Sequence, residues 1–206
     1  MSAISQDGRN FTAEAGVRVD NGGTHDSAVA GGPNIVKLPN GTLRMYYYGY
    51  SDRYRILSAH STDGLNWTKE EGVRLDAGPA GSYDSDGVVN SRVIRVAGGN
   101  YLMFYCGNGG SPAENRILRA VSTDGLNFTK ATGFCIEAAQ LTALGYGSFP
   151  SGVSPGDIVP LGGNKYRMYF TADRYNLTII DRIPVFTGLF TVQSKSQAAI
   201  NFLLLD

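Results

Sequence analysis

Two aspartates occupy matching places in this sequence and have the chemistry for acid–base work. Asp26 follows His25, Asp84 follows Tyr83, and a run of β-forming residues begins three or four positions after each Asp. Two carboxylates at one pocket can cleave a glycosidic bond when one stays ionised and the other is kept protonated by burial or by a like charge. We therefore take Asp26 and Asp84 as the first candidate catalytic residues.

A third acidic group would come from Asp86 or Glu114. Glu114 lies two positions before Arg116, and an acidic residue near an arginine recurs at Asp52–Arg55 and at Asp173–Arg174. We take Glu114 as the third candidate catalytic residue. The alternative is that these residues are turn caps and surface ion pairs, which contribute little to stability.

Six further residues on the same connections are candidates for holding a substrate. Charged groups would hydrogen-bond to sugar hydroxyls, and tyrosine rings would stack against the apolar face of a sugar. The candidates are His25, Asp86, Arg53, Arg116, Tyr83 and Tyr146. His25 could also bind a metal, but the corresponding connections hold no second histidine to complete such a site. We expect no metal and no cofactor.

The elements that must position these residues follow from a phrase that the chain repeats. Ser-x-Asp-Gly-x-Asn occurs at 5–10, 61–66 and 122–127, with an aromatic residue and a threonine after each copy. Copies spaced by about 56 and about 61 residues indicate stacked supersecondary units. Asp and Gly are expected to supply the positive φ values of a tight hairpin turn. We interpret the phrase as structural.

A second hairpin precedes each full copy of the phrase, so that one unit holds four short antiparallel strands. Four-stranded units repeated around an axis are typical of a β-propeller. The sequence therefore predicts an all-β fold, a β-propeller of four-stranded antiparallel blades forming a single domain over 1–206. It would consist of an N-terminal half-blade over 2–20 and three whole blades over about 26–76, 84–137 and 147–206.

Propeller geometry separates the repeated phrase from the candidate site. The connections between blades, and those between the second and third strands of a blade, lie on one face of such a ring. Asp26, Asp84 and Glu114 belong to these connections, whereas the repeated phrase belongs to the turns of the opposite face. We expect the carboxylates to converge on an axial pocket.

The third predicted blade differs from the other two. An insertion over about 175–187 precedes an eroded copy of the phrase at Ser196–Phe202, where Ala-Ala replaces Asp-Gly. A half-blade leaves strand edges that can pair with another chain. The chain would be a piece of a longer propeller, a small closed ring, or a protomer. We favour a homo-oligomer that completes the propeller, with the apolar segment Leu177–Phe186 as the candidate interface.

Composition narrows the classes of partner. Lys plus Arg and Asp plus Glu are equal at 18, so the net charge is zero. Without a basic patch we expect no nucleic acid. No apolar run reaches the length of a transmembrane helix and the N-terminus lacks signal-peptide features, so we expect no membrane partner and leave the localisation open. Cys106 and Cys135 are interpreted as small buried residues, with a disulfide as the alternative.

The strands of the first whole unit carry a distinctive pattern of residues. Asn34–Val36, Leu43–Gly49 and Ile56–Thr68 spell Asn-Ile-Val, Leu-Arg-Met-Tyr-Tyr-Tyr-Gly and Ile-Leu-Ser-Ala-His-Ser-Thr-Asp-Gly-Leu-Asn-Trp-Thr. This pattern resembles blades of the five-bladed propeller glycosidases, a superfamily that includes arabinanase, xylosidase, fructosidase and mannoside-phosphorylase families. The resemblance extends over nearly all of the chain and is more specific for the fold than for an activity.

The resemblance also implies roles for residues. It implies a base Asp on one inner strand, a second Asp on the next and a Glu acid on the third. Asp26 and Asp84 match the first two positions, whereas 146–152 holds no Glu. Five such units would need roughly 290 residues, more than the 206 of this chain, which would make it a shortened form.

We therefore expect a glycosidase-like propeller that acts on or binds carbohydrate at an axial pocket lined by carboxylates. The alternative is a non-catalytic module that binds carbohydrate or only self-assembles.

Overall fold

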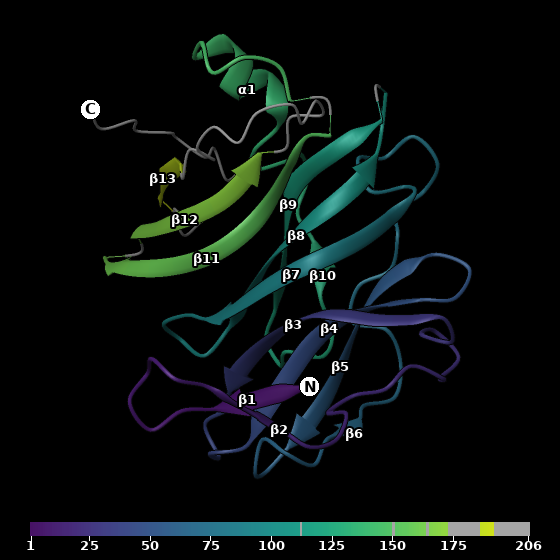
Figure 1. The fold of residues 1–206 in the computed structure, drawn as a ribbon. Helices are drawn as coiled ribbons and strands as arrows, with labels where there is room; N and C mark the ends of the chain where they lie inside the picture. The colour runs from purple at the N-terminus through teal and green to yellow at the C-terminus, as the bar shows by residue number, and fades with distance from the viewer. Residues whose placement is uncertain (112, 150, 164, 173–185, 192–206) are drawn as a thin grey trace.

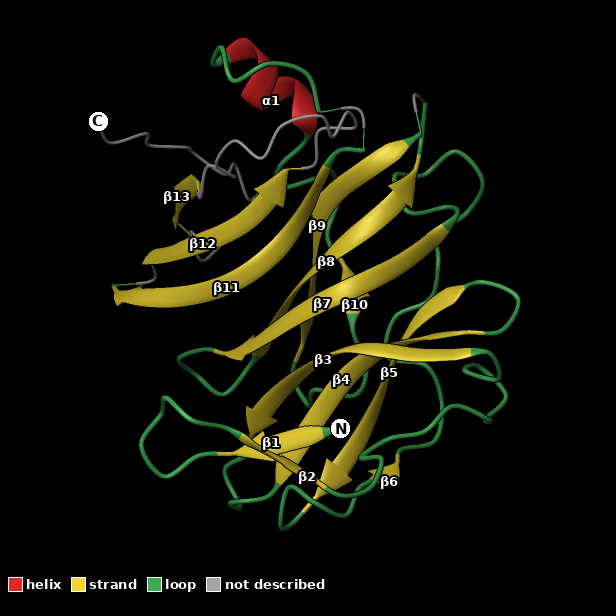
Figure 2. Cartoon of the chain, in the orientation of Figure 1, coloured by secondary structure: helices red, strands yellow, loops and turns green. Residues whose placement is uncertain are grey.

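The computed structural model describes residues 1–111, 113–149, 151–163 and 165–172, together with the backbone of 186–191. Strands dominate this part of the chain, and its one helix is the short α1 (Ala138–Ala143) (Figure 2). The prediction of an all-β class is confirmed. Two predicted features lie outside the described residues, namely the eroded phrase at 196–202 and the insertion as far as residue 185.

The strands form an N-terminal hairpin and three successive units (Figure 1). The hairpin pairs β1 (Ser2–Ile4) with β2 (Thr12–Glu14). Unit 1 consists of β3 (Val29–Lys37), β4 (Leu43–Tyr50), β5 (Tyr54–Ser61) and β6 (Thr68–Lys69). Unit 2 consists of β7 (Gly87–Arg95), β8 (Tyr101–Gly109), β9 (Glu114–Ser122) and β10 (Thr129–Lys130). The described part of unit 3 consists of β11 (Val153–Gly162), β12 (Lys165–Ala172) and β13 (Phe186–Thr191).

The units meet through single backbone pairs and through buried side chains. Tyr54 pairs in parallel with Gly87 between units 1 and 2, and Asn115 pairs in parallel with Gly152 between units 2 and 3. Within each unit, neighbouring strands are antiparallel. The described strands do not close into a ring. Units 1 and 2 thus belong to one continuous sheet, joined by a single pair, and each unit depends on its neighbour to cover an apolar face.

Two buried clusters join the units. The first interface cluster, between units 1 and 2, includes Tyr46, Ile56, Val93, Met103 and Tyr105. The second interface cluster, between units 2 and 3, includes Phe104, Ile117, Cys135, Phe149 and Met168. Because alternate residues of a strand point to opposite faces, β8 supplies both clusters from neighbouring positions.

We call β3, β7 and β11, the first strands of the three units, the inner strands. They run in the same direction, and their ends lie toward the left of Figure 1. We call the face where these strands begin the loop face, and the face where they end the turn face. The register of each inner strand shifts at one place, between Gly31 and Asn34, between Val89 and Arg92, and between Pro155 and Ile158. A bulge of this kind re-aims side chains.

The repeated phrase forms one hydrogen-bonded loop three times. In the second copy, Ser61 Oγ accepts the N–H groups of Asp63 and Gly64 and donates to the Asp63 carboxylate. That carboxylate also accepts the next two N–H groups and the side-chain amide of Asn66. The copies at 5–10 and 122–127 repeat every one of these bonds.

These bonds correct one detail of the turn prediction. Positive φ occurs at the glycine of each phrase but not at its aspartate, so the Asp side chain, and not its backbone, shapes the loop. Hydrogen bonds to the carboxylate, led by the N–H of the phrase's Asn, lower the pKa of Asp7, Asp63 and Asp124 below the ordinary range. The phrase is a local structural device, as the sequence predicts.

Unit 3 uses the opposite alternation of side chains from unit 2. Met168 of β12 and Phe104 of β8 are equivalent positions, because each pairs with the first residue after the bulge of its own unit. Phe104 faces away from unit 1. Met168 and Phe170 nevertheless face back toward unit 2. Unit 3 therefore covers unit 2 with the face that the other units turn the other way.

Candidate functional site

Asp26 lies at the loop face of unit 1 and is only 1% exposed. Lys69 Nζ from β6 lies 2.6 Å from Oδ2, the Tyr47 hydroxyl donates to the same oxygen at 3.0 Å, and the Gly23 N–H donates to Oδ1 at 2.7 Å. Burial alone would raise the pKa of Asp26, but the bonds from Lys69, Tyr47 and Gly23 outweigh it and lower the pKa. Groups of its own unit therefore hold this carboxylate ionised.

Asp84 has the same surroundings in unit 2 and is 3% exposed. Lys130 Nζ from β10 lies 2.6 Å from Oδ2, the Tyr105 hydroxyl donates to it at 3.0 Å, and Ser82 Oγ donates to Oδ1 at 2.9 Å. Burial and the neighbouring carboxylate raise the pKa of Tyr105, as they do for its counterpart in unit 1. The hydroxyl is thus a donor to the aspartate.

The structure brings the two aspartates to equivalent positions in neighbouring units. We call each set an Asp–Tyr–Lys trio, Asp26–Tyr47–Lys69 in unit 1 and Asp84–Tyr105–Lys130 in unit 2. In both trios the Asp and the Tyr are 21 residues apart, a repeat that the sequence already contains. Each trio ties the connection before the inner strand to the second and fourth strands of its unit. The catalytic assignment of Asp26 and Asp84 stays a prediction.

Glu114 belongs to a buried ion-pair cluster around Arg116. Arg116 Nη2 lies 2.9 Å from Glu114, Nε lies 3.3 Å from Glu137, and Nη1 donates to the carbonyl of Gly109 at 3.0 Å. The guanidinium also lies over the Tyr83 ring, 4.8 Å from its centroid. A side chain with this many protein partners fixes the start of β9 in place.

Unit 1 repeats that cluster around Arg55. Its guanidinium contacts Asp52 at 2.5 Å and Asp76 at 3.0 Å, and the side chain is buried. Arg53, the residue chosen from the sequence, is about half exposed and lies 3.5 Å from Asp52. The predicted recurrence of an acid beside an arginine is therefore an ion pair in both units, with Arg55 as the counterpart of Arg116.

The remaining candidates lie around these clusters. His25 is partly buried beside Asp26. The Tyr83 ring meets Phe134 edge-on, with 5.3 Å between the centroids. Tyr146 follows α1 and is 41% exposed, and its N–H donates to the carbonyl of Leu141.

A pocket of about 370 Å³ lies between units 1 and 2, and we call it the inter-unit pocket. It is lined by Tyr48, Tyr54, Asp86, Gly87, Val89, Asn90, Asn108 and Asn115. Asp86 is the predicted substrate-binding residue that lies in it, and its carboxylate accepts the Ser85 hydroxyl at 3.1 Å. Among the described residues that line the pocket, Asp86 supplies the acidic group, and neither Asp26 nor Asp84 belongs to the lining.

Unit 1 gives the inter-unit pocket an aromatic wall. Tyr54 meets Tyr48 edge-on at 5.7 Å and lies 4.7 Å from Tyr50, measured between ring centroids. Tyr48 lies directly over Gly32, where an added Cβ would come within 2.7 Å of the ring. The glycine of the β3 bulge is therefore what lets the Tyr48 ring settle against the backbone.

Unit 2 gives the same pocket a wall of side-chain amides. Asn108 Nδ2 donates to Asn115 Oδ1 at 2.9 Å, at the two positions where unit 1 has Tyr50 and Tyr54. Asn90, in the β7 bulge, donates to Ser154 Oγ of unit 3 at 3.2 Å. Asn90 has a φ of 50°, and among the described residues it is the one non-glycine residue with a positive φ. Backbone conformations of this kind cluster at functional sites.

These asparagines and Tyr48 were not predicted from the sequence. A signal for Asn90 exists, because Asn-Ser-Arg interrupts an apolar strand between Val89 and Val93. The pairing of Asn108 with Asn115 has no local signal, since strand register decides it.

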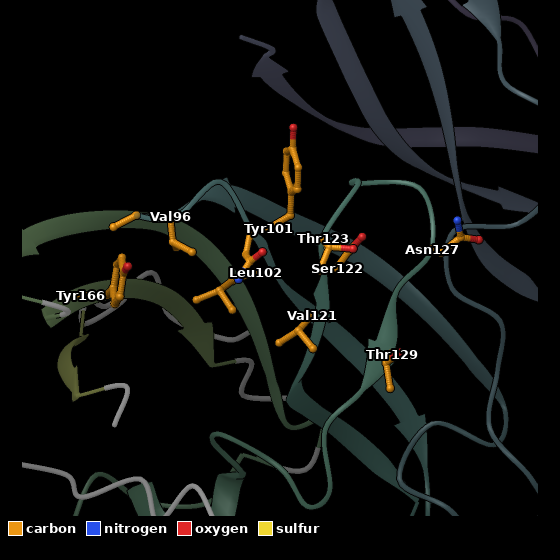
Figure 3. A pocket seen from close by; sticks show the side chains of 11 residues that line it. Val96, Tyr101, Leu102, Val121, Ser122, Thr123, Asn127, Thr129 and Tyr166 are labelled. Carbon is orange, nitrogen blue, oxygen red and sulfur yellow. The ribbon is translucent and has the colours of Figure 1, made fainter. Parts of the chain in front are cut away.

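A second pocket, of about 450 Å³, lies between the turn face of unit 2 and unit 3 (Figure 3). Figure 3 shows Val96 and Tyr166 on one side and Asn127 and Thr129 on the other. No acidic or basic side chain is among the described residues that line it. This pocket therefore lacks the groups for acid–base chemistry.

The described residues contain no group of three or more His, Cys, Asp or Glu side chains arranged to hold a metal ion. No helix within the described ranges is long and apolar enough to cross a membrane. Cys106 and Cys135 are both buried thiols and are not joined in a disulfide, which confirms their interpretation as small buried residues. Burial raises the pKa of the Cys135 thiol to about 11.

The sequence relationships of this chain are partial. No protein-family model matches the chain. An uncharacterized protein of Mycobacterium tuberculosis is 36% identical over 110 residues, which cover 52% of this chain and 35% of that protein. The match thus spans about a third of the curated relative.

Comparison with solved structures is more informative. A glycosyl hydrolase from Bacteroides ovatus matches with a TM-score of 0.58 and 19% identity, over 80% of this chain and 47% of that chain. An endo-1,4-β-xylanase from Bacteroides thetaiotaomicron matches with a TM-score of 0.61 and 13% identity, over 95% and 63%. The fold is shared with glycoside hydrolases. The predicted resemblance to a glycoside hydrolase superfamily is confirmed at the level of the fold.

A third similar structure comes from work on the GH130 family of mannoside phosphorylases, described as containing glycoside hydrolases that target β-1,2 mannosidic linkages. It matches with a TM-score of 0.59 and 19% identity, over 87% of this chain and 49% of that chain. The chain therefore spans about half the length of several of these enzymes.

Proposed function

We propose that this protein binds a neutral carbohydrate in the inter-unit pocket, on an arc of β-propeller blades. The observation that carries the proposal is the composition of the pocket, which combines Tyr48 and Tyr54 on one wall with Asn90, Asn108 and Asn115 on the other. Sugars present apolar C–H faces to aromatic rings and hydroxyls to amide groups. A volume of about 370 Å³ lies in the usual range for small-molecule sites.

The fold supports this proposal independently of the pocket. The solved proteins of similar fold are glycoside hydrolases, and β-1,2 mannosidic and β-1,4 xylan linkages are named for two of them. The repeated four-stranded units are consistent with blades of a propeller, and the pocket lies where two such units adjoin. Carbohydrate is therefore the ligand class that the fold and the pocket composition have in common.

The number of acidic side chains in the inter-unit pocket favours binding over hydrolysis. Glycoside hydrolysis normally needs two carboxyl groups about 5 to 9 Å apart on either side of the scissile bond. The described residues of the pocket provide Asp86 alone, while Asp26 and Asp84 are each bound by a lysine. A single carboxylate is suited to accept hydrogen bonds from sugar hydroxyls.

Titration calorimetry with β-1,2-mannobiose and β-1,4-xylobiose tests the proposal. We expect one disaccharide to bind with a Kd of ~0.1–1 mM, and Tyr54→Ala and Asn115→Ala to weaken it about tenfold. Asn40→Ala is the matched control, because Asn40 lies in the β3–β4 turn, outside the lining. Absence of binding for both sugars, or equal affinity in Asn115→Ala and Asn40→Ala, contradicts the proposal.

A second candidate function is hydrolysis at Asp26 and Asp84, with Glu114 as the acid. It is favoured by the shared fold and by the equivalent positions of the two aspartates. Turnover of aryl glycosides by the wild type, lost in Asp84→Asn with an unchanged melting temperature, would support it. We also propose that copies of the chain associate to complete the propeller, and a monomeric mass in light scattering would contradict that.

A further inference from the structure

We propose that the protein has a separate anion-binding pocket at the turn face, with a doubly or multiply charged phosphate as its ligand. A pocket of about 550 Å³ lies at the ends of the inner strands, where the three units come together. It is distinct from the inter-unit pocket, with which it shares no lining residue. The proposal does not depend on carbohydrate binding.

Three cationic side chains line this turn-face pocket, one from each unit. Lys37 ends β3, Arg95 ends β7, and Lys165 begins β12. Figure 1 shows the corresponding strand ends on the same side of the molecule. All three residues are exposed, which places their charges at the rim of the pocket.

Strand register explains why the three charged residues all lie at the turn face. Lys37 and Arg95 are the last paired residues of their inner strands, opposite Leu43 and Tyr101. In unit 3 the inner strand ends in Gly162, and the cation comes from the residue paired with it, Lys165. Each unit therefore has a positive charge where its first and second strands meet at the turn, on the first strand in units 1 and 2 and on the second strand in unit 3.

The remaining lining concentrates the field of these charges. Val36 and Val93 are buried, and other apolar side chains of the inner strands complete the wall. No acidic residue is among the described residues that line the pocket. Low-dielectric walls and charges of one sign attract ions of the opposite sign. The local excess is notable because the whole chain is neutral, with 18 residues of each sign.

The turn between β11 and β12 adds two glycines to the rim. Gly162 and Gly163 both line the pocket, with φ values of 85° and 56°. Successive glycines in this conformation can direct N–H groups at an anion. Arg95 lies over the corresponding turn of unit 2, where an added Cβ on Gly99 would be 3.1 Å from its Nη2. Three separate cations favour a ligand that bridges several charges over a single small anion.

Titration calorimetry with pyrophosphate at low ionic strength tests the proposal. Methyl phosphate, which has one phosphate group where pyrophosphate has two, is the comparison. We expect pyrophosphate to bind more tightly than methyl phosphate, and the affinity to fall about tenfold when salt is raised from ~20 to ~200 mM. Arg95→Gln and Lys37→Gln should each weaken pyrophosphate binding about tenfold, and Arg95→Lys should retain most of it.

Arg9→Gln is the matched control, because it removes one positive charge from an exposed residue of the N-terminal hairpin. It should bind pyrophosphate like the wild type. Equal affinity in Arg95→Gln and Arg9→Gln, or no binding at ~10 mM pyrophosphate, overturns the proposal. A melting curve for each variant separates a lost site from a lost fold. Asn115→Ala should leave pyrophosphate binding unchanged, so that the two pockets are tested independently.

Discussion

Units 1 and 2 have nearly the same internal bonds but very different surroundings. Both contain the Asp–Tyr–Lys trio, the buried arginine between two acids, and the hydrogen-bonded phrase. Unit 2 is covered on one face by unit 1, through the first interface cluster. The matching face of unit 1 forms a smaller cluster of Tyr47, Leu57 and Ala59, with Val19 from the N-terminal segment packed against it.

Equivalent side chains show the size of this difference. Val93 of unit 2 is 3% exposed, whereas Ile35, which holds the same position in unit 1, is 50% exposed. Local sequence thus determines the bonds inside a unit, while burial depends on what covers the unit. Burial of apolar area is the larger contribution to stability, so equivalent mutations in the two units should have unequal effects.

The largest difference is expected for methionine in the second strand. Met103→Ala in unit 2 removes a side chain that is fully buried in the first interface cluster, and should lower the free energy of unfolding by about 3 kcal/mol. Met45, the matching residue of unit 1, is 7% exposed and belongs to none of the three apolar clusters of the described residues, so Met45→Ala should cost less, under about 2 kcal/mol. Urea denaturation measures both, and equal losses would mean that the outer face of unit 1 is covered as well as that of unit 2.

The trios should give intermediate and nearly equal effects. Asp26→Asn and Asp84→Asn each leave a lysine and a buried hydroxyl without their anionic partner, and should cost about 2 kcal/mol. Tyr47→Phe and Tyr105→Phe provide milder versions of the same test. If thermal melting shows no change for the Asn variants, the trios are not structural and the catalytic prediction gains weight.

The same trio predicts an acid response. The folded pKa of Asp26 lies below its ordinary value of about 3.9, so the unfolded chain binds more protons at low pH. Its stabilising contribution is complete above that ordinary value and is lost as the pH falls toward the lower, folded pKa. Asp26→Asn should therefore show a smaller fall in Tm than the wild type between about pH 5 and pH 2.5. Parallel curves for the two proteins would rule this contribution out.

The smallest effect on stability is expected at Ile35. Ile35→Thr changes a half-exposed side chain and should alter the free energy of unfolding by less than about 0.5 kcal/mol, whereas Val93→Thr places a hydroxyl in the first interface cluster and should cost over about 1 kcal/mol. A second copy bound to the outer face of unit 1 would change this comparison. Light scattering on Ile35→Thr would then show weaker association than the wild type.

The sequence predicted the fold class because its signals are local. The Ser-x-Asp-Gly-x-Asn phrase contains every donor and acceptor of its own loop, so three copies fold alike wherever they occur. Glycine-containing turns between β-forming runs likewise fixed where strands begin and end. Even so, positive φ was wrongly expected at the aspartate, because a side-chain carboxylate and a turn backbone leave the same residues in a sequence.

The candidate site was predicted less well because it depends on contacts between units. Asp86, which lines the inter-unit pocket, was among the predicted binding residues because an acidic residue on a connecting loop is conspicuous, and its role stays a prediction. Asn108 and Asn115 were missed, because only the register of β8 with β9 brings their amides together. Tyr48 was not predicted as a pocket residue, because only the absent side chain of Gly32 lets its ring line a pocket.

The sequence by itself determined the units of this protein: their strands, their turns, and the pairing partners that lie within about 60 residues. The tertiary structure alone decided which surfaces meet. It gave Asp26 and Asp84 their lysines, set an aromatic wall of unit 1 opposite an amide wall of unit 2, and brought Lys37, Arg95 and Lys165 to one pocket. Hydrogen bonds within a turn follow from neighbouring residues, whereas contacts between sheets follow from register and from the face that each sheet buries.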